Sequence, residues 1–254
     1  MLAIRAVPAF KDNYIWILER GGNAAAVDPG DARPVEEFLS KKGLTLTAVL
    51  ATHHHSDHVG GLAELASRWG CPTFGPAREV REKLDTRLRE GDRFEVPGIG
   101  VALEAIDIPG HTAGHIALTG EGMLFCGDTL FACGCGRLFE GTAAQMSASL
   151  AKLAALPAKT RVYCAHEYTM ANIRFAEAVE PGNTALARRK ARDGARRARG
   201  EATVPSTIGE ELATNPFLRC GEPEVVASAE RHAGRRLADP IAVFAEIRAW
   251  KNTF

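Results

Sequence analysis

The sequence predicts an α/β fold in which β-sheets are sandwiched by helices, followed by a helical C-terminal region. Short apolar runs alternate with helix-like patterns through roughly the first 170 of the 254 residues. Beyond that point the strand-like runs stop and helical spacing continues. Several strand-like runs also end directly on a histidine or an aspartate, which places polar side chains on loops at one sheet edge.

The predicted α/β region opens with two adjacent strands and a helix. The apolar runs at residues 14–18 and 24–27 indicate the strands. The pattern from Pro34 to Lys42 then predicts a helix. Proline is favoured in a first turn, and Gly43 is a typical residue at a helix end.

The next strand and helix surround the most polar part of this region. Residues 49–51 predict a strand that is followed by a histidine-rich segment. Residues 62–69 then carry apolar side chains at helical spacing, and Gly70 ends the pattern.

Two later helices are predicted from their first residues. Thr142 and Gln145 form a capping-box pattern, and an amphipathic helix follows it as far as Pro157. Asp239 and Pro240 form an N-cap and first helical residue, after which Ile241, Phe244 and Ile247 follow helical spacing. The chain is therefore expected to divide into residues 1–170 and a helical domain of residues 171–254.

Composition excludes some classes of function. The chain has 31 basic and 31 acidic residues, so its net charge gives no general attraction to nucleic acid or to an anionic membrane. No apolar run approaches the roughly 20 residues that span a bilayer, and no secretory signal is expected. The six cysteines are scattered, which favours a reducing cytoplasm. Cys133 and Cys135 lack the two-residue gap of redox pairs, so small buried or loop thiols are the better interpretation.

The most informative segment is the histidine cluster, residues 53–58, with the sequence HHHSDH. Side chains two apart in an extended chain point the same way, so His53, His55 and Asp57 can converge. His58 joins them if the chain turns there. Neutral imidazole and ionised carboxylate suit zinc, iron or manganese, so the cluster predicts a metal site.

Three more candidate ligands, His111, Asp128 and His166, each follow a short apolar run. Taken alone, each is more often an ordinary strand-end residue than a ligand. Together with the cluster they make seven candidates. That is too many for one tetrahedral site and about right for two metal ions that share one carboxylate.

These motifs resemble the metallo-β-lactamase superfamily and, within it, glyoxalase II, the hydroxyacylglutathione hydrolases. The superfamily resemblance rests on Thr52–His58, Asp28-Pro29-Gly30, Gly110–His115, Phe125–Thr129 and His166–Thr169. The narrower one rests on Asp12-Asn13-Tyr14, Cys135–Thr142, Asn215–Arg219 and Arg248–Lys251. The resemblance implies a metallo-β-lactamase-like αββα sandwich, with residues 1–170 as the catalytic domain and residues 171–254 as a helical substrate-binding domain.

The resemblance also implies a set of metal ligands. It places His53, His55 and His111 on one metal ion, Asp57, His58 and His166 on the other, and Asp128 between them. Asp28 is expected to support the site from outside, whereas His54 and His115 are not expected to be ligands. The expected cofactor is two divalent ions, zinc first, with iron and manganese left open because all three accept these donors.

Five residues resemble substrate contacts, namely Arg137, Phe139, Tyr168, Arg248 and Lys251. Arg248 and Lys251 lie three apart on a predicted helix and can clamp a glutathione carboxylate, although without the resemblance they would pass for an ordinary exposed pair. Family members often carry lysine in place of Arg137, which keeps the charge. They often carry tyrosine in place of Phe139, so one hydrogen bond worth roughly 0.5–1.5 kcal/mol is lost.

The activity that the resemblance implies is hydrolysis of S-(2-hydroxyacyl)glutathione, such as S-D-lactoylglutathione, to glutathione and D-lactate. Hydroxide held between the two metals would attack the thioester, since metal-bound water has a pKa of about 7.

A cytoplasmic monomer without nucleic-acid or membrane partners is expected. The alternatives are a lactam or lactone hydrolase, a one-metal iron persulfide dioxygenase, and an RNA-binding or scaffold protein that uses the basic run at residues 188–199.

Overall fold

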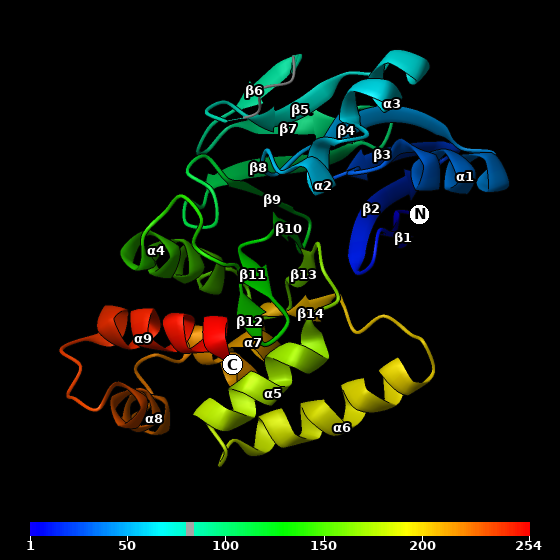
Figure 1. The fold of residues 1–254 in the computed structure, drawn as a ribbon. Coiled ribbons are helices and arrows are strands. Elements are labelled where there is room, and N and C mark those ends of the chain that lie inside the picture. Colours follow the sequence, from blue (N-terminus) through cyan, green and yellow to red (C-terminus); the bar gives the residue numbers. More distant parts are fainter. Residues whose placement is uncertain (80–83) are drawn as a thin grey trace.

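Two six-stranded sheets form the centre of the fold (Figure 1), in a computed structural model that describes residues 1–79 and 84–254. The first sheet contains, in spatial order, β1 (Ala3–Ala9), β2 (Asn13–Arg20), β3 (Asn23–Val27), β4 (Thr45–Leu50), β5 (Thr73–Pro76) and β6 (Thr86–Leu88). The second contains β14 (Ser206–Thr207), β13 (Arg161–Cys164), β10 (Met123–Gly127), β9 (Ile116–Gly120), β8 (Val101–Asp107) and β7 (Arg93–Val96).

Helices cover the outer faces of both sheets (Figure 1). The first sheet carries α1 (Ala32–Lys42), α2 (Ser56–Val59) and α3 (Leu62–Trp69). Below the second lie α4 (Ala143–Ala154), α5 (Thr169–Val179), α6 (Thr184–Ala198), α7 (Ile208–Thr214), α8 (Pro223–Ala233), α9 (Pro240–Thr253) and the 3-10 helix η1 (Pro216–Leu218). The predicted αββα sandwich with a helical C-terminal region is confirmed.

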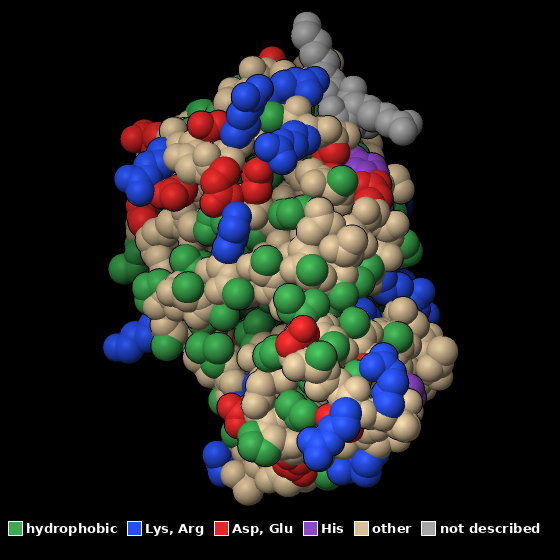
Figure 2. Space-filling view, turned by 90° about the vertical axis from the view of Figure 1, so that its left-hand side faces the viewer, with side chains coloured by type: hydrophobic (Ala, Val, Ile, Leu, Met, Phe, Trp, Pro, Cys, Tyr) green, Lys and Arg blue, Asp and Glu red, His purple; other side chains and the backbone are tan. Residues whose placement is uncertain are grey.

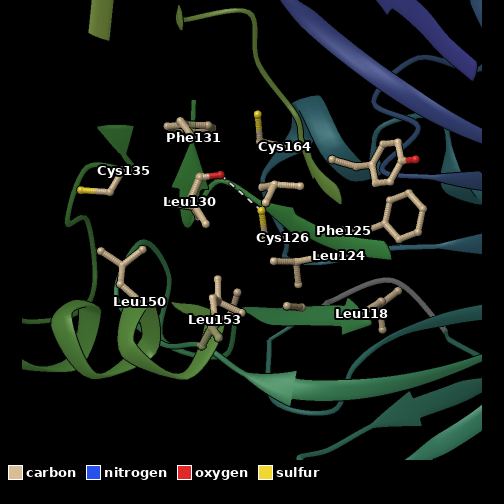
Figure 3. Close-up of a cluster of buried hydrophobic side chains, with 14 of the residues drawn as sticks. Leu118, Leu124, Phe125, Cys126, Leu130, Phe131, Cys135, Leu150, Leu153 and Cys164 are labelled. Carbon is tan, nitrogen blue, oxygen red and sulfur yellow. Dashed lines mark hydrogen bonds between the residues drawn. The ribbon is translucent and has the colours of Figure 1, made fainter. Parts of the chain in front are cut away.

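Strand alternation builds two cores. Tyr14, Trp16 and Leu18 of β2 belong to the larger core, which lies between the sheets and extends to α4, α5 and α9. Ile15 and Ile17 point the other way, into the core beneath α1 and α3. This alternation follows from the two-residue period of a strand that is buried on both faces. In the larger core, Leu150 and Leu153 of α4 pack with residues of β9 and β10 (Figure 3).

The predicted helix ends agree with the structure, with small shifts. α1 begins two residues before Pro34, because the side chain of Asp31 accepts a hydrogen bond from the Arg33 amide, 2.9 Å away, and so caps the helix earlier. Gly43 ends it in the left-handed conformation. The capping box of Thr142 and Gln145 is present.

The C-terminal helix α9 is capped by Asp239 as predicted, but only two of the three apolar residues that follow its helical spacing are buried. Ile241 is 45% exposed, whereas Val243 is buried together with Phe244 and Ile247. The residues of α9 that pack on the core begin at Val243, two positions after Ile241.

The C-terminal region also returns to the sheet. β14 pairs antiparallel with β13, Val162 opposite Ser206, although the sequence shows no strand signal there. A two-residue strand is too short to produce a pattern. The small hairpin of β11 (Leu130–Phe131) and β12 (Gly134–Cys135) lies between the second sheet and these helices (Figure 1). The division at residue 170 stays a prediction.

None of the helices in residues 1–79 and 84–254 is long and apolar enough to cross a bilayer. All six cysteines are free and buried, including Cys133 and Cys135.

Candidate metal and substrate site

Strand ends and one short helix bring the candidate ligands together. The residue His53 follows β4, His111 follows β8, Asp128 follows β10 and His166 follows β13. The carboxyl ends of these strands meet at one edge of the two sheets, where loops leave the sandwich. α2 turns the chain at His58, as predicted.

The glycine after α2 is required for close packing and not for an unusual dihedral. Gly60 has φ −58°, which any residue adopts. A Cβ there would lie 2.4 Å from the carbonyl oxygen of Gly30, so a larger residue would push α2 away from the loop after β3. The turn that directs His58 inward therefore depends on this close backbone approach.

The first donor group is formed by His53, His55 and His111. The distance from His53 Nε2 to His55 Nδ1 is 3.1 Å, and that from His111 Nε2 to the same His55 atom is 3.0 Å. One ring nitrogen from each residue lies within 4.8 Å of the other two. Three imidazoles that face one point suit one ion of a binuclear site.

The second donor group is formed by Asp57, His58 and His166. Asp57 Oδ2 lies 3.6 Å from His58 Nε2 and 3.6 Å from His166 Nε2. Asn13 donates a hydrogen bond to the same Asp57 oxygen, at 3.0 Å, and so fixes the carboxylate. These donors also lie within 4.8 Å of one another.

Asp128 lies between the two groups. Its Oδ1 is 3.4 Å from His58 Nε2 and 3.3 Å from His166 Nε2, whereas its Oδ2 is 3.5 Å from His111 Nε2. Each carboxylate oxygen thus faces a different donor group. This is the geometry needed by a carboxylate that is shared by two cations.

Outer contacts orient the histidine rings. His111 Nδ1 lies 2.9 Å from the carbonyl oxygen of Arg137, and His166 Nδ1 lies 2.8 Å from Asp12 Oδ1. Both acceptors require a proton on Nδ1, which leaves the Nε2 lone pair free and directed into the site.

Asp28 supports the other side of the site. It accepts hydrogen bonds from Thr52, at 2.7 Å from the backbone amide and 2.8 Å from the hydroxyl. Its Oδ2 also lies 3.1 Å from His58 Nδ1, and the Thr52 hydroxyl lies 3.1 Å from His53 Nδ1. Asp28 has φ +54°, which is uncommon for a residue other than glycine, so the fold holds it in a strained position beside the ligands.

The electrostatics separate the ligands into two kinds. Burial lowers the pKa of His53, His55 and His111, which keeps these imidazoles neutral. For Asp128, burial alone would raise the pKa, but the neighbouring His58 and His166 hold it well below its usual range. The first donor group therefore offers neutral imidazoles, and Asp128 offers an ionised carboxylate. Although burial alone would lower it, the carboxylate of Asp128 raises the pKa of both His58 and His166, so these two imidazoles would give up a proton when a cation binds.

Buried polar atoms that lack hydrogen-bond partners also indicate a metal site. Within the described part of the chain, His58 Nε2 and Asp128 Oδ1 are buried and have no hydrogen-bond partner. Buried polar atoms are rarely left in this state, and here both face the centre of the donor groups. Divalent cations would satisfy them.

His115 is built into the loop and does not join either donor group. The amide of Asp128 donates a hydrogen bond to His115 Nε2 over 3.2 Å, so this nitrogen is an acceptor. The His115 ring stacks on that of His53, with the centroids 4.4 Å apart. This agrees with the expected role of fixing a loop.

His54 points to a separate group of side chains, as the alternation of an extended chain requires. Its ring nitrogens lie 3.4 Å from Glu79 and 3.4 Å from Glu140.

A cavity of about 470 Å³ opens beside Asp128 and His111. All five predicted substrate contacts line it: Arg137, Phe139, Tyr168, Arg248 and Lys251. A metal-donor cluster and several cationic side chains therefore share one pocket.

Arg248 and Lys251 both line this pocket, but they differ in burial and in their contacts. Arg248 is 3% exposed, donates to the carbonyl oxygen of Cys135 at 2.8 Å, and leaves its Nε without a partner among the described residues. Lys251 is half-buried, with Nζ 5.1 Å from the centre of the Phe175 ring. Burial, together with the nearby charge of Arg248, lowers the pKa of Lys251 to about 8. Two adjacent cations in a half-buried pocket favour an anionic ligand.

Two aromatic rings flank the donors. Tyr168 stacks on His166 with the ring centroids 4.7 Å apart and the planes 4° apart. Phe139 lies 5.2 Å from the His111 ring and is 63% exposed, so it stands at the mouth of the pocket.

Comparison with known proteins agrees with these features. The model of the metallo-beta-lactamase superfamily matches residues 10–166, and that of the hydroxyacylglutathione hydrolase C-terminus matches residues 167–254. A protein of Alkalilimnicola ehrlichii named hydroxyacylglutathione hydrolase is 58% identical over 99% of both chains. One of Nitrosomonas europaea with the same name is 51% identical over 100% of this chain and 97% of its own.

The chain belongs to the hydroxyacylglutathione hydrolase family. Solved structures support the fold of this family member. ETHE1 from Myxococcus xanthus superposes with a TM-score of 0.66 at 23% identity, covering 100% of this chain and 99% of its own. A metallo-beta-lactamase from Staphylococcus aureus superposes with 0.63 at 21% identity, covering 98% and 71%. The metallo-β-lactamase-like fold class is thereby confirmed.

The basic run of this hydroxyacylglutathione hydrolase family member is largely neutralised within the fold. Arg189 is buried, Lys190 binds Glu177 at 2.8 Å, and Arg199 binds Glu201 at 2.7 Å. Basic side chains that are paired with acidic ones do not favour a nucleic-acid surface. Figure 2 shows a different face, that of α4 and α9, where basic and acidic side chains lie above and below a mostly apolar centre.

Sequence reasoning missed the roles of Asp12 and Asn13. Asp12 lies in the turn between β1 and β2, and Asn13 begins β2; they reach His166 and Asp57 across more than 40 positions of the chain. Their motif was recognised by resemblance, but nothing in its local pattern indicates which ligand each residue supports.

Proposed function

We propose that this protein is a binuclear metal-dependent thioester hydrolase that converts S-(2-hydroxyacyl)glutathione, such as S-D-lactoylglutathione, to glutathione and a 2-hydroxy acid such as D-lactate. The observation that carries the proposal is one pocket, lined at once by Asp128 of the donor groups and by the cations Arg248 and Lys251. The name shared by relatives that are 50–58% identical supports the glutathione substrate.

The proposal assigns each donor group one divalent ion. His53, His55 and His111 would hold the first and Asp57, His58 and His166 the second, with Asp128 shared by both. Zinc suits these donors best, and iron or manganese would also be accepted by imidazole and carboxylate.

When bound, divalent ions supply Lewis acidity and a water molecule of lowered pKa. The side chains of the protein arrange the rest. Asn13 fixes Asp57, Asp12 holds the proton on His166 Nδ1, and His115 fixes the backbone of Asp128. Hydrolysis adds the elements of water across the thioester, so the acyl–sulfur bond breaks and the glutathione sulfur leaves as a thiolate.

The pocket would bind the glutathione part of the substrate. Lys251 and the free Nε of Arg248 would face a glutathione carboxylate. Arg137 would add a third positive charge, and Tyr168 and Phe139 would border the peptide chain. Residues 1–170 would thus supply the metal donors together with Arg137, Phe139 and Tyr168, and the helical domain of residues 171–254 would supply the two cations that face the glutathione carboxylate.

The remaining parts of the proposal concern partners and setting. A small-molecule substrate, a monomeric state and the cytoplasm are the simplest assignment. The internal pairing of the basic run supports the absence of a nucleic-acid partner. The buried free thiols are consistent with a reducing compartment.

The test combines metal analysis with substrate assays. Metal-loaded wild type is expected to hydrolyse S-D-lactoylglutathione with two ions per chain, and to leave a lactam, a lactone and glutathione persulfide unchanged. Asp128→Ala should lose metal occupancy and most activity, because both donor groups lose their shared carboxylate. Glu64→Ala, which removes an exposed carboxylate on α3, is the matched control and should behave as wild type. Wild type that leaves the thioester intact but turns over another member of this panel would overturn the proposal.

A further inference from the structure

The tip of the β11–β12 hairpin is held by side chains from the C-terminal helices. In each of the four successive residues from Phe131 to Gly134, a backbone N–H or C=O group is hydrogen-bonded to one of these side chains. Asn172 donates to Ala132 O at 2.9 Å, Asn215 donates to Phe131 O at 3.1 Å and to Gly134 O at 2.9 Å, and the Cys133 amide donates to Glu211 Oε2 at 2.8 Å. A hairpin tip is normally solvated, so hydrogen bonds from protein side chains to four successive residues of the tip are unusual.

These three side chains, Asn172, Glu211 and Asn215, are here called the polar clamp. Each is at most 3% exposed. Asn215 also donates to Glu211 Oε2 at 3.1 Å, which links two members of the clamp. The residue they surround, Cys133, has φ +56°, a conformation that residues other than glycine rarely adopt. A strained residue of this kind persists only where its surroundings hold it.

The charge of Glu211 is balanced by the buried member of the basic run. Arg189 Nη2 donates to Glu211 Oε1 at 2.7 Å, and the same guanidinium donates to Thr214 at 2.7 Å and to Asp193 at 3.3 Å. Arg189 and Glu211 are almost completely buried. A buried ion pair recovers its desolvation cost only with such additional hydrogen bonds, and replacing it by apolar residues is often no less stable. A contribution to the stability of the fold is therefore a weak explanation for the buried Arg189–Glu211 ion pair.

The hairpin connects the clamp to the substrate pocket. Cys135 of β12 accepts the hydrogen bond from Arg248, and the amide of Gly136 donates to Thr129 O at 3.1 Å, one residue beyond Asp128. Phe131 and Cys135 line the pocket directly. Figure 3 shows Leu130, Phe131 and Cys135 on the two short strands, beside the sheet that carries Cys126.

We propose that Glu211 is a positioning residue for substrate binding: through the clamp it holds the β11–β12 hairpin as the pocket wall that orients Arg248. The inference rests on the proposed function, because it assigns the C-terminal helices an effect on the glutathione end of the pocket. Glu211 itself does not line that pocket, and its effect passes through the Cys133 amide and the Cys135 carbonyl.

The test compares Glu211→Gln with Glu210→Gln. Glutamine at 211 keeps the size of the side chain but turns an NH₂ group toward Arg189 or toward the Cys133 amide, so one of these contacts is lost. Glu210 is the matched control, since it pairs with Arg192 and Arg189 while none of its hydrogen bonds in the described part of the chain reaches the hairpin. Hydrogen exchange of the segment 129–137, metal content, and KM for two thioesters are measured. One thioester is S-D-lactoylglutathione, and the other is the lactoyl thioester of N-acetylcysteamine, which lacks the glutathione carboxylates.

In Glu211→Gln, we expect exchange in residues 129–137 to accelerate about tenfold while β2–β4 stay protected. KM for the glutathione thioester should rise roughly 5- to 20-fold, with KM for the N-acetylcysteamine thioester and the metal content unchanged. Glu210→Gln should match wild type in all of these measurements.

Unchanged exchange in 129–137, or an equal loss for both thioesters, would overturn the positioning role. If Glu211→Gln does not fold, Glu211→Asp is judged by the same criteria, because it keeps the charge but is one methylene too short to reach both Arg189 and Cys133. A wild type inactive on both thioesters would refute the proposed function, and the exchange data would still decide whether Glu211 holds the hairpin.

Discussion

Asp12 Oδ1 lies 2.8 Å from His166 Nδ1, although the two residues are 154 positions apart. The contact joins the β1–β2 turn of the first sheet to the end of β13 in the second. It thus connects the two halves of the sandwich directly behind a proposed metal ligand, and it determines which nitrogen of His166 faces the site.

Asp12→Asn tests this outer contact. Asparagine can still accept from His166 Nδ1, but it no longer offers a full negative charge to the imidazole. Supporting residues of this kind typically change metal affinity by roughly 10- to 100-fold, so we expect the affinity for one of the two ions to fall by about that amount. Competition with a metal chelator measures the change. Asp31→Asn, at a partly exposed N-cap that asparagine replaces well, should leave both affinities intact. Unaltered affinities in Asp12→Asn would contradict the role of Asp12.

The variant Lys251→Ala tests whether Lys251 contributes to substrate binding or to the catalytic step. The side chain lies in the pocket with Arg248 and would bind a carboxylate remote from the thioester. Loss of such a contact mainly raises KM, whereas kcat changes little. Steady-state kinetics with S-D-lactoylglutathione provide the measurement, and Lys190→Ala, on the surface of α6, is the control. A normal KM with a collapsed kcat would rule out this role for Lys251.

The lowered pKa of Lys251 predicts a pH dependence. Burial and the charge of Arg248 bring the pKa from 10.5 to about 8, so the ammonium is charged below pH 8 and neutral above it. KM for the glutathione thioester should therefore rise as the pH increases from 7 to 9.5. Lys251→Arg stays charged throughout this range and should flatten the profile. Identical profiles for wild type and Lys251→Arg would show that another group controls the pH dependence.

Phe139→Tyr tests the departure from the family pattern. Phe139 stands exposed at the mouth of the pocket, so a hydroxyl added there needs no repacking. One recovered hydrogen bond of roughly 0.5–1.5 kcal/mol should lower KM about 2- to 10-fold, with the melting temperature unchanged. If KM does not move, the position of Phe139 does not contribute a substrate hydrogen bond in this chain.

Much of the site was predictable because its ligands follow local rules. The two-residue period of an extended chain directs His53 and His55 to one side and His54 to the other, and the structure shows this separation. His111 and Asp128 were recognisable as polar residues directly after apolar runs. Strand direction then brings such residues to one edge of a sheet.

Other features had no local signal. Ile241 has the helical spacing of a core residue and is nevertheless exposed, because only the packing of α9 decides which turn meets the core. The clamp on the β11–β12 hairpin is equally non-local: Glu211 and Cys133 are 78 positions apart. The buried Arg189 also looks like any other arginine of a solvated basic helix.

The amino-acid sequence by itself determined the change from an α/β region to a helical region, the seven candidate ligands and the family, since these depend on periodicity and on short motifs. Only the tertiary structure decided which carboxylates stand behind the ligands, how Arg248 is buried and what supports the pocket wall. Those properties arise from contacts between distant segments. Such contacts form only when the chain folds, because bringing the segments together costs conformational entropy.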